Sequence, residues 1–301
     1  MRAAAQPLRA VSTLERSWPG VWADLVKARL TLLVLVTTLV GFYMGSPPSV
    51  DCLLLAHTLI GTGLLACGAS ALNQLWERDH DARMRRTENR PLPSGRLQPD
   101  TVLMFGTAAS VVGAAWLAVW VNPTACWLGA VTLGSYLFIY TPLKRVTWMN
   151  TLVGAVPGAL PPLLGWAAAR HDLGLGGWAL FAILFLWQIP HFLAIAWLYR
   201  DDYARAGFVM LPLLDPAGVR TGRQALSHAG ALLGVCLMPA LCGLTGALYP
   251  AGAMLLGLTF LALAARFSRG PTPARARALF LASIIYLPCL LGLMVWDKVR
   301  T

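Results

Sequence analysis

The chain has 301 residues, of which 57% are hydrophobic and only 12% are Asp, Glu, Lys or Arg. Soluble domains carry about 25% charged residues, so this composition argues against a large soluble helical domain. It also excludes a disordered chain, which needs low hydrophobicity. The sequence is typical of a membrane protein.

Nine apolar stretches follow one another along the chain. A bilayer core of about 30 Å needs about 20 helical residues to cross it. The apolarity is continuous rather than alternating, which predicts helices and not the strands of an outer-membrane barrel. We therefore expect an all-α bundle of nine transmembrane helices. The expected spans are 30–46, 53–75, 101–121, 124–141, 148–168, 178–198, 226–248, 251–266 and 278–296.

The basic residues predict how this bundle is oriented. With a cytoplasmic N-terminus, all 24 Lys and Arg residues fall on the cytoplasmic side except Arg170, Lys298 and Arg300. The positive-inside rule then gives a cytoplasmic arm of residues 1–29, one transmembrane domain over 30–296 and an external tail of 297–301. The net charge of +11 would lie on one membrane face, where it suits anionic lipid and an anionic substrate rather than nucleic acid.

The first of three polar clusters follows the second span. Asn73, Glu77 and Asp81 are spaced by four residues, which places them on one face of a helix, with Asp79 just off that face. Polar groups near the membrane are costly and are functional candidates. Mg²⁺ is usually held by one or two carboxylates together with waters and substrate phosphates. This spacing therefore predicts a Mg²⁺ site.

Two arginines extend this cluster toward phosphate chemistry. Arg86 and Arg90 are again four residues apart, and guanidinium groups bind phosphate oxygens bidentately. Acidic and basic groups in one segment indicate a metal–phosphate site. The alternative is a solvated loop with incidental ion pairs.

The second cluster, Tyr140, Lys144 and Arg145, lies at the end of the fourth span. Two cations beside a membrane end are usually topology markers, but the topology puts these on the same side as the first cluster. The prolines that follow, at 157, 161 and 162, predict a broken helix that lines a cavity.

The third cluster begins inside the sixth span. Gln188 and His191 share a helix face, beside Trp187, and Asp201 and Asp202 follow at the end of the span. The aspartates are a second candidate carboxylate pair for Mg²⁺, or a hydrated helix end. Since the clusters end spans two, four and six, all three meet on one face. Together they predict a site for an amphiphile with a diphosphate head and an apolar tail.

The motifs in these clusters resemble a known family. N-x₃-E-x₃-D followed by RTxNRPLPSG is similar to the first acidic motif of the UbiA-type intramembrane prenyltransferases. YTPLKR-x-T-x₂-NTLVGA-x-PGA-x-PP-x₂-GW and WQ-x-PHF-x₆-Y-x-DDY-x₃-G-x₂-MLP resemble more specifically the members that farnesylate haem. The resemblance covers about residues 20–296.

The resemblance implies a nine-helix bundle with a central cavity open toward the cytoplasm, in a bacterial inner membrane. The implied reaction joins haem B, farnesyl diphosphate and water to give haem O and diphosphate, which serves haem–copper oxidases. Oxidase assembly proteins or a haem A synthase would be further partners.

The resemblance also implies roles for the motif residues. Mg²⁺ would bind at Asn73, Glu77 and Asp81, with a second ion at Asp201 or Asp202, and His191 would contact haem at iron or at a propionate. The family usually has Asp where this chain has Glu77; if the longer side chain is not tolerated, Asp79 would replace it. The leaving diphosphate would bind Arg86, Arg90, Lys144 and Arg145, and the aromatic rings facing the allylic cation would be Trp76, Tyr136, Tyr140, Trp187 and Phe192.

Three alternatives stay open. A relative in the same family would prenylate an aromatic quinone precursor or a chlorophyll-type tetrapyrrole. A transporter also uses broken helices and buried polar residues. A non-catalytic oxidase assembly factor would tolerate the loss of Asp81.

Overall fold

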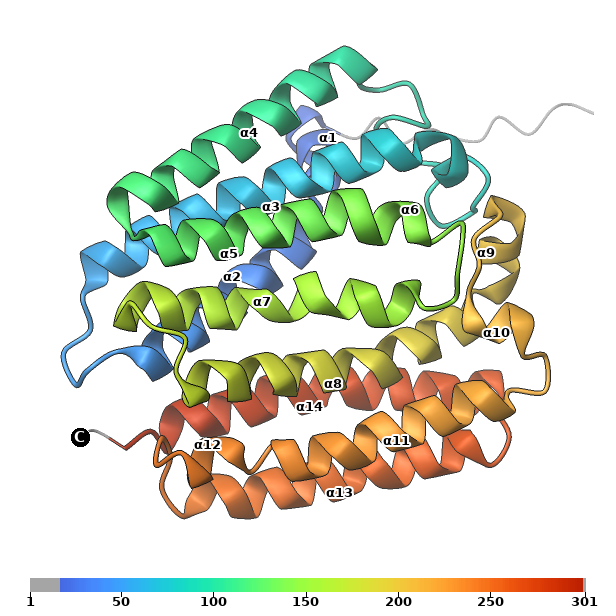
Figure 1. The fold of residues 1–301 in the computed structure, drawn as a ribbon. Coiled ribbons are helices and arrows are strands. Elements are labelled where there is room, and N and C mark those ends of the chain that lie inside the picture. Colours follow the sequence, from blue (N-terminus) through green and yellow to red (C-terminus); the bar gives the residue numbers. More distant parts are fainter. Residues whose placement is uncertain (1–16, 300–301) are drawn as a thin grey trace, which may run out of the picture.

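The computed structural model describes residues 17–299 (Figure 1). In this part of the chain, nine helical segments are long and apolar enough to cross a membrane, and no strand is formed, so the all-α prediction is confirmed. Arg2, Arg9, Arg16 and Arg300, which entered the charge count, lie outside the described residues. The spans are α2 (Ala28–Gly45), α3 (Cys52–Asp81), α4 (Pro99–Trp120), α5 with η1 and α6 (Pro123–Leu143), α7 (Asn150–Arg170), α8 (Leu175–Leu198), α11 with α12 (Val219–Leu241), α13 (Leu248–Ser268) and α14 (Pro273–Trp296).

Two sequence expectations about these spans were wrong. The seventh span was expected at 226–248 but covers Val219–Leu241, because the helix takes the exposed Arg220 and Arg223 into its first turns. A broken helix was expected at the prolines of the fifth span, but α7 is continuous through all three. Proline is tolerated there because neighbouring helices surround α7, which is the most buried of the described spans.

The centre of the bundle is α7, which lies between α5 and α8 in Figure 1 and also packs along α2. The α2–α7 contact is backbone to backbone: a Cβ on Gly41 would overlap the Pro162 backbone, and one on Gly165 would overlap Thr38. Small residues let membrane helices approach this closely. The contact fixes the helices that later form walls of the cavity.

A short helix before the first span packs against α3 and α4. In α1 (Trp18–Leu25), Val21 and Leu25 are buried against residues of α3 and α4 and the loop between them. Gln74 of α3 donates hydrogen bonds to the carbonyl oxygens of Asp24 and Leu25, at 2.9 and 2.7 Å. The next turn passes through Lys27 in a left-handed conformation (φ 48°). Residues 17–27 of the expected arm are therefore packed on the bundle.

Two further short helices lie at one end of the bundle, α9 (Arg200–Ala206) and α10 (Leu211–Leu214). In Figure 1 they lie near α6 (Thr141–Leu143) and the end of α3, whereas α12 (Met238–Leu241) lies at the opposite end. His80 of α3 contacts the carbonyl oxygen of Ala206 at 2.7 Å through Nδ1 and stacks on Phe208. The three polar clusters of the sequence therefore meet at one end of the fold.

Candidate active site

One face of α3 carries the first polar cluster. Asn73, Glu77 and Asp81 follow one another by about one turn, and their exposed fractions are 1%, 4% and 0%. Charged side chains are almost never fully buried unless they are paired. The partners of these three residues therefore define the site.

Each of the three side chains accepts a hydrogen bond from a different cation. Lys27 Nζ lies 2.8 Å from Asn73 Oδ1. Lys144 Nζ lies 2.6 Å from Glu77 Oε1, and Arg90 Nη1 lies 2.6 Å from Asp81 Oδ2. The cations come from the turn before α2, the end of α6 and the loop after α3. When all three are protonated they outnumber the carboxylates, so the cluster suits an additional anion.

The surroundings tune the two lysines in opposite directions. Burial, together with the positive charge of Arg90, lowers the pKa of Lys27 to about 7. Burial also opposes the charge of Lys144, but Tyr140 and Glu77 outweigh it and hold the pKa of Lys144 above its ordinary value. Lys144 is thus a fixed cation beside the carboxylates.

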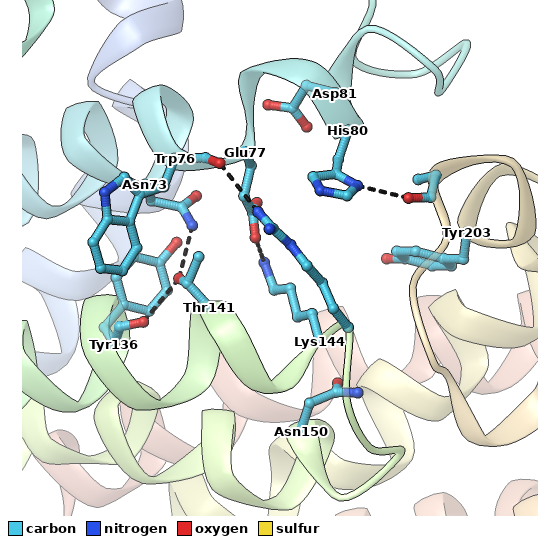
Figure 2. Close-up of polar contacts among 12 residues, drawn as sticks. Asn73, Trp76, Glu77, His80, Asp81, Tyr136, Thr141, Lys144, Asn150 and Tyr203 are labelled. Atoms are coloured by element: carbon cyan, nitrogen blue, oxygen red, sulfur yellow. Dashed lines mark hydrogen bonds and ion pairs between the residues drawn. The ribbon is translucent and has the colours of Figure 1, made fainter.

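The fourth span contributes to this cluster through an unusual turn. Residues Ser135–Tyr140 form the π-helix η1, a feature that often marks functional sites. Lys27 Nζ lies 3.4 Å from the Tyr136 hydroxyl, and Lys144 Nζ lies 4.5 Å from the centre of the Tyr140 ring. Figure 2 shows Lys144 reaching Glu77, and Asn73 facing Thr141, to which its amide donates at 3.0 Å.

A cavity of about 320 Å³ extends from these tyrosines into the bundle. Tyr136, Tyr140, Gln188 and His191 contribute polar groups to a lining that is otherwise mostly apolar. Ligand pockets are commonly about 300–1,000 Å³ and mostly apolar, with few polar groups. The cavity therefore extends from Tyr136 and Tyr140, which contact Lys27 and Lys144 of the α3 cluster, to the α8 residues.

Glycines of α7 make room for two of these side chains. A Cβ at Gly154 would overlap the Tyr140 ring, and one at Gly158 would overlap the Gln188 amide. Gln188 donates to the Leu184 carbonyl oxygen at 3.0 Å and to that of Ala155 at 3.4 Å, which holds α8 against α7.

The aromatic residues of α8 form the far part of the site. The rings of Trp187 and His191 stack with their centroids 5.1 Å apart, and Phe192 meets His191 edge-on. All three line the cavity.

Two of the predicted cations, Arg86 and Arg145, have other partners. Arg86 Nη2 donates to the Tyr203 hydroxyl at 3.2 Å, and its guanidinium lies over the Tyr199 and Tyr203 rings. Arg145 Nη2 donates to the Trp76 carbonyl oxygen at 3.3 Å. Both side chains are partly open to solvent, so they differ from Lys27, Arg90 and Lys144, which contact the α3 face directly.

Three predicted metal ligands are not brought to the α3 face. Asp79 is two residues beyond Glu77, about 200° around the helix, and its side chain is 78% exposed beside Arg78. The Asp201 side chain is 90% exposed beside Arg200, and Asp202 pairs with Arg205 in the same short helix. Within residues 17–299, no hydrogen bond or ion pair joins these three aspartates to Asn73, Glu77 or Asp81.

Sequence reasoning missed Lys27 as a site residue. A single lysine before the first span looks the same as a topology marker, and its contact with Asn73 spans 46 positions. Gln74, next to Asn73, is an uncharged polar residue inside an apolar span, and it was a weak sign that another segment packs at this point of α3. Its hydrogen bonds to α1 hold the turn that carries Lys27.

The donor atoms of the α3 face fit Mg²⁺. Asp81 Oδ1 is buried and has no hydrogen-bond partner among the described residues. Those residues contain no group of three or more His, Cys, Asp and Glu side chains placed to hold a metal ion. Two carboxylates and an amide oxygen are nevertheless the donor set expected where phosphate oxygens and waters complete a Mg²⁺ shell.

Comparison with known proteins agrees with this geometry. The model of the UbiA prenyltransferase family matches residues 34–287. The chain belongs to this family. A relative from Solibacter usitatus, named protoheme IX farnesyltransferase, is 49% identical over 286 residues, which cover 92% of this chain and 98% of the relative.

Solved structures share the UbiA fold. A structure of digeranylgeranylglyceryl phosphate synthase matches with a TM-score of 0.79 at 14% identity, over 92% of this chain and 97% of that chain. A UbiA homolog from Archaeoglobus fulgidus, bound to GPP and Mg²⁺, matches with a TM-score of 0.64 at 14% identity, over 91% and 99% of the two chains. Together with the nine apolar helices, family membership identifies a multi-pass membrane prenyltransferase.

Proposed function

We propose that this protein transfers the farnesyl group of farnesyl diphosphate to a vinyl group of haem B, with addition of water, to give haem O and diphosphate. The observation that carries the proposal is one cavity that runs from Tyr136 and Tyr140 to an aromatic site around His191. These two tyrosines contact Lys27 and Lys144, the cations bound to Asn73 and Glu77. The named relative from Solibacter usitatus supports this choice of substrates.

The cluster binds the diphosphate. Lys27, Arg90 and Lys144 exchange their present contacts for diphosphate oxygens, with Arg86 and Arg145 as further cations. The bond between farnesyl C1 and oxygen then breaks, and its electron pair leaves with the diphosphate. Fixed cations lower the barrier because they stabilise the charge that develops on the leaving group.

Asn73, Glu77 and Asp81 are the residues that would hold Mg²⁺. The bound ion would neutralise negative charge on the diphosphate oxygens. The relative bound to GPP and Mg²⁺ supports a metal requirement. A second ion near Asp201 or Asp202 stays a prediction.

The cavity protects the allylic cation until the acceptor reacts. Tyr140 and Tyr136 present aromatic faces near the cations, and the remaining lining is mostly apolar, which keeps water from C1. The π electrons of the vinyl group form the new carbon–carbon bond at C1. Water adds to the resulting cation beside the porphyrin and loses a proton, which balances the reaction.

The membrane placement is part of the proposal. Because the basic residues gather at the end of the bundle that carries the site, we place this end in the cytoplasm and the chain in a bacterial inner membrane. The product would pass to a haem A synthase or to proteins that assemble haem–copper oxidases.

The test uses membranes that contain the protein, supplied with haem B, farnesyl diphosphate and Mg²⁺, with and without EDTA. Extracted haems are separated by chromatography, and their masses are determined by mass spectrometry. We expect a haem that has gained one farnesyl group and one water, only in the samples without EDTA.

Other outcomes separate the alternatives. Prenylation of a quinone precursor or another tetrapyrrole, with no haem product, would keep the diphosphate site and overturn the acceptor. Uptake of labelled substrate into proteoliposomes without any prenylated product would indicate a transporter. An EDTA-resistant farnesylated haem would overturn the metal assignment alone.

A further inference from the structure

A single serine of α14 contacts two aromatic residues of α8. Ser283 is fully buried. Its backbone carbonyl oxygen accepts a hydrogen bond from Trp187 Nε1 at 2.9 Å, and its hydroxyl oxygen lies 2.6 Å from His191 Nδ1. Because Trp187 and His191 are one turn apart and stack on each other, Ser283 holds both rings.

The hydroxyl group of Ser283 also determines which nitrogen of His191 carries hydrogen. Ser283 Oγ lies 2.5 Å from the Phe280 carbonyl oxygen. A carbonyl oxygen cannot donate, so the only hydrogen of the hydroxyl lies in this contact. Toward His191 the hydroxyl oxygen is then an acceptor, and Nδ1 is the donor. In the neutral imidazole this leaves Nε2 with a lone pair.

The remaining nitrogen is available to a molecule in the cavity. His191 lines the cavity, whereas Ser283 binds it from the α14 side. Nε2 makes no hydrogen bond to any of residues 17–299. The ring also contacts the rings of Trp187 and Phe280, each with its centroid 5.1 Å away. The position and the tautomer of the imidazole are thus both fixed.

We propose that Ser283 is a positioning residue that holds His191 with its Nε2 lone pair toward the cavity, where Nε2 ligates the iron of the haem acceptor. The inference rests on the proposed function, which makes haem the acceptor. A neutral imidazole nitrogen is a common metal ligand, and the partner of the other nitrogen sets its orientation. A propionate would instead need a donor at Nε2, which this tautomer does not have.

The experiment measures haem binding without farnesyl diphosphate, in full-length protein in nanodiscs. Ferric haem B is titrated against the wild type, Ser283→Ala, His191→Ala and Ser110→Ala. Ser110 is the matched control, because it is another buried helix serine whose hydroxyl binds a carbonyl of its own helix, Gly106, away from the cavity. Soret absorption gives the affinity, and resonance Raman of the ferrous complex gives the iron–histidine stretching frequency.

We expect Ser283→Ala to weaken haem binding about ten- to a hundredfold, the usual effect of losing the hydrogen-bond partner of a ligating histidine. It should also shift the iron–histidine frequency, a change that general loosening of the helix does not produce. We also expect His191→Ala to lose the histidine-ligated spectrum. Ser110→Ala should bind haem like the wild type.

Two results would overturn the inference. One is a Ser283→Ala protein with wild-type affinity and frequency, and the other is a histidine-ligated spectrum that survives in His191→Ala. Either would leave the proposed function standing, because haem would still bind. Failure of the wild type itself to bind haem would count against the proposed function and the inference together.

Discussion

Lys144 Nζ and Glu77 Oε1 lie 2.6 Å apart and join two helices across 67 sequence positions. Both side chains are almost completely buried, at 12% and 5% exposed. Removing one partner from a buried ion pair is costly, because the other charge stays without compensation. The pair therefore ties the end of α6 to α3 and holds a carboxylate and a cation side by side in the candidate site.

Glu77→Gln should reduce turnover about a hundredfold or more, because it removes a carboxylate from the metal side and the counter-charge of Lys144. Asp79→Asn, two residues away on the exposed side of α3, is the matched control and should keep near-normal turnover. Formation of the farnesylated haem in membranes measures both. An equal loss in the two variants would contradict the placement of Asp79 outside the site.

Asp81→Ala should abolish turnover while the protein still inserts into the membrane. Its Oδ2 binds Arg90, and its Oδ1 is buried with no hydrogen-bond partner among residues 17–299, so the variant loses both a candidate metal donor and the anchor of a cation. Product analysis together with quantification of the protein in washed membranes tests this. Asp100→Ala, at the exposed start of α4, controls for loss of one acidic residue. Near-normal turnover of Asp81→Ala would show that the metal assignment is wrong.

Lys27→Met should weaken farnesyl diphosphate binding about ten- to a hundredfold, the effect of losing one hydrogen bond to a charged group. Arg29→Met removes the same charge from an exposed position two residues later and should change binding little. Calorimetric titration with farnesyl diphosphate and Mg²⁺ gives both affinities. If Lys27 were only a topology marker, the two variants would behave alike.

Gly41→Ala should destabilise the protein by about 1–3 kcal/mol, because the new methyl group overlaps the Pro162 backbone, which cannot move aside as a side chain can. A Cβ at Gly292 in α14 would meet no atom of residues 17–299 within 4 Å beyond its own helix backbone, so Gly292→Ala should be neutral or slightly stabilising. Thermal unfolding in detergent compares the two variants. Equal melting temperatures would contradict the close α2–α7 contact.

The fold was largely predictable from the sequence, because bilayer thickness leaves few solutions for nine apolar stretches. The errors arose where hydropathy alone is ambiguous. Arg220 and Arg223 are polar enough to end a span on a hydropathy scale, yet both lie exposed on the first turns of a helix. The prolines of α7 look like helix breaks, but burial among other helices keeps the helix continuous.

Site residues that share one helix face could be predicted from their spacing in the sequence. Site residues that tertiary packing brings together from distant positions could not. The spacing of Asn73, Glu77 and Asp81 placed them on one face, as found. No local pattern relates Lys27 to Asn73, or Ser283 to His191 across 92 positions. Asp201 and Asp202 were misleading for the opposite reason. An acidic pair after a span looks the same in sequence whether it enters a site, as predicted, or points to solvent and pairs with a neighbouring arginine, as Asp201 and Asp202 do respectively.

The two parts of the proposed substrate site come from different parts of the chain. The residues that contact the α3 face, Lys27, Arg90 and Lys144, all lie within the first half of the sequence, whereas the aromatic site is built by α8 and α14. Divergence can therefore act on the two halves separately. A lineage that retains the first half and alters α8 and α14 would inherit the leaving-group chemistry unchanged while it acquires a new acceptor.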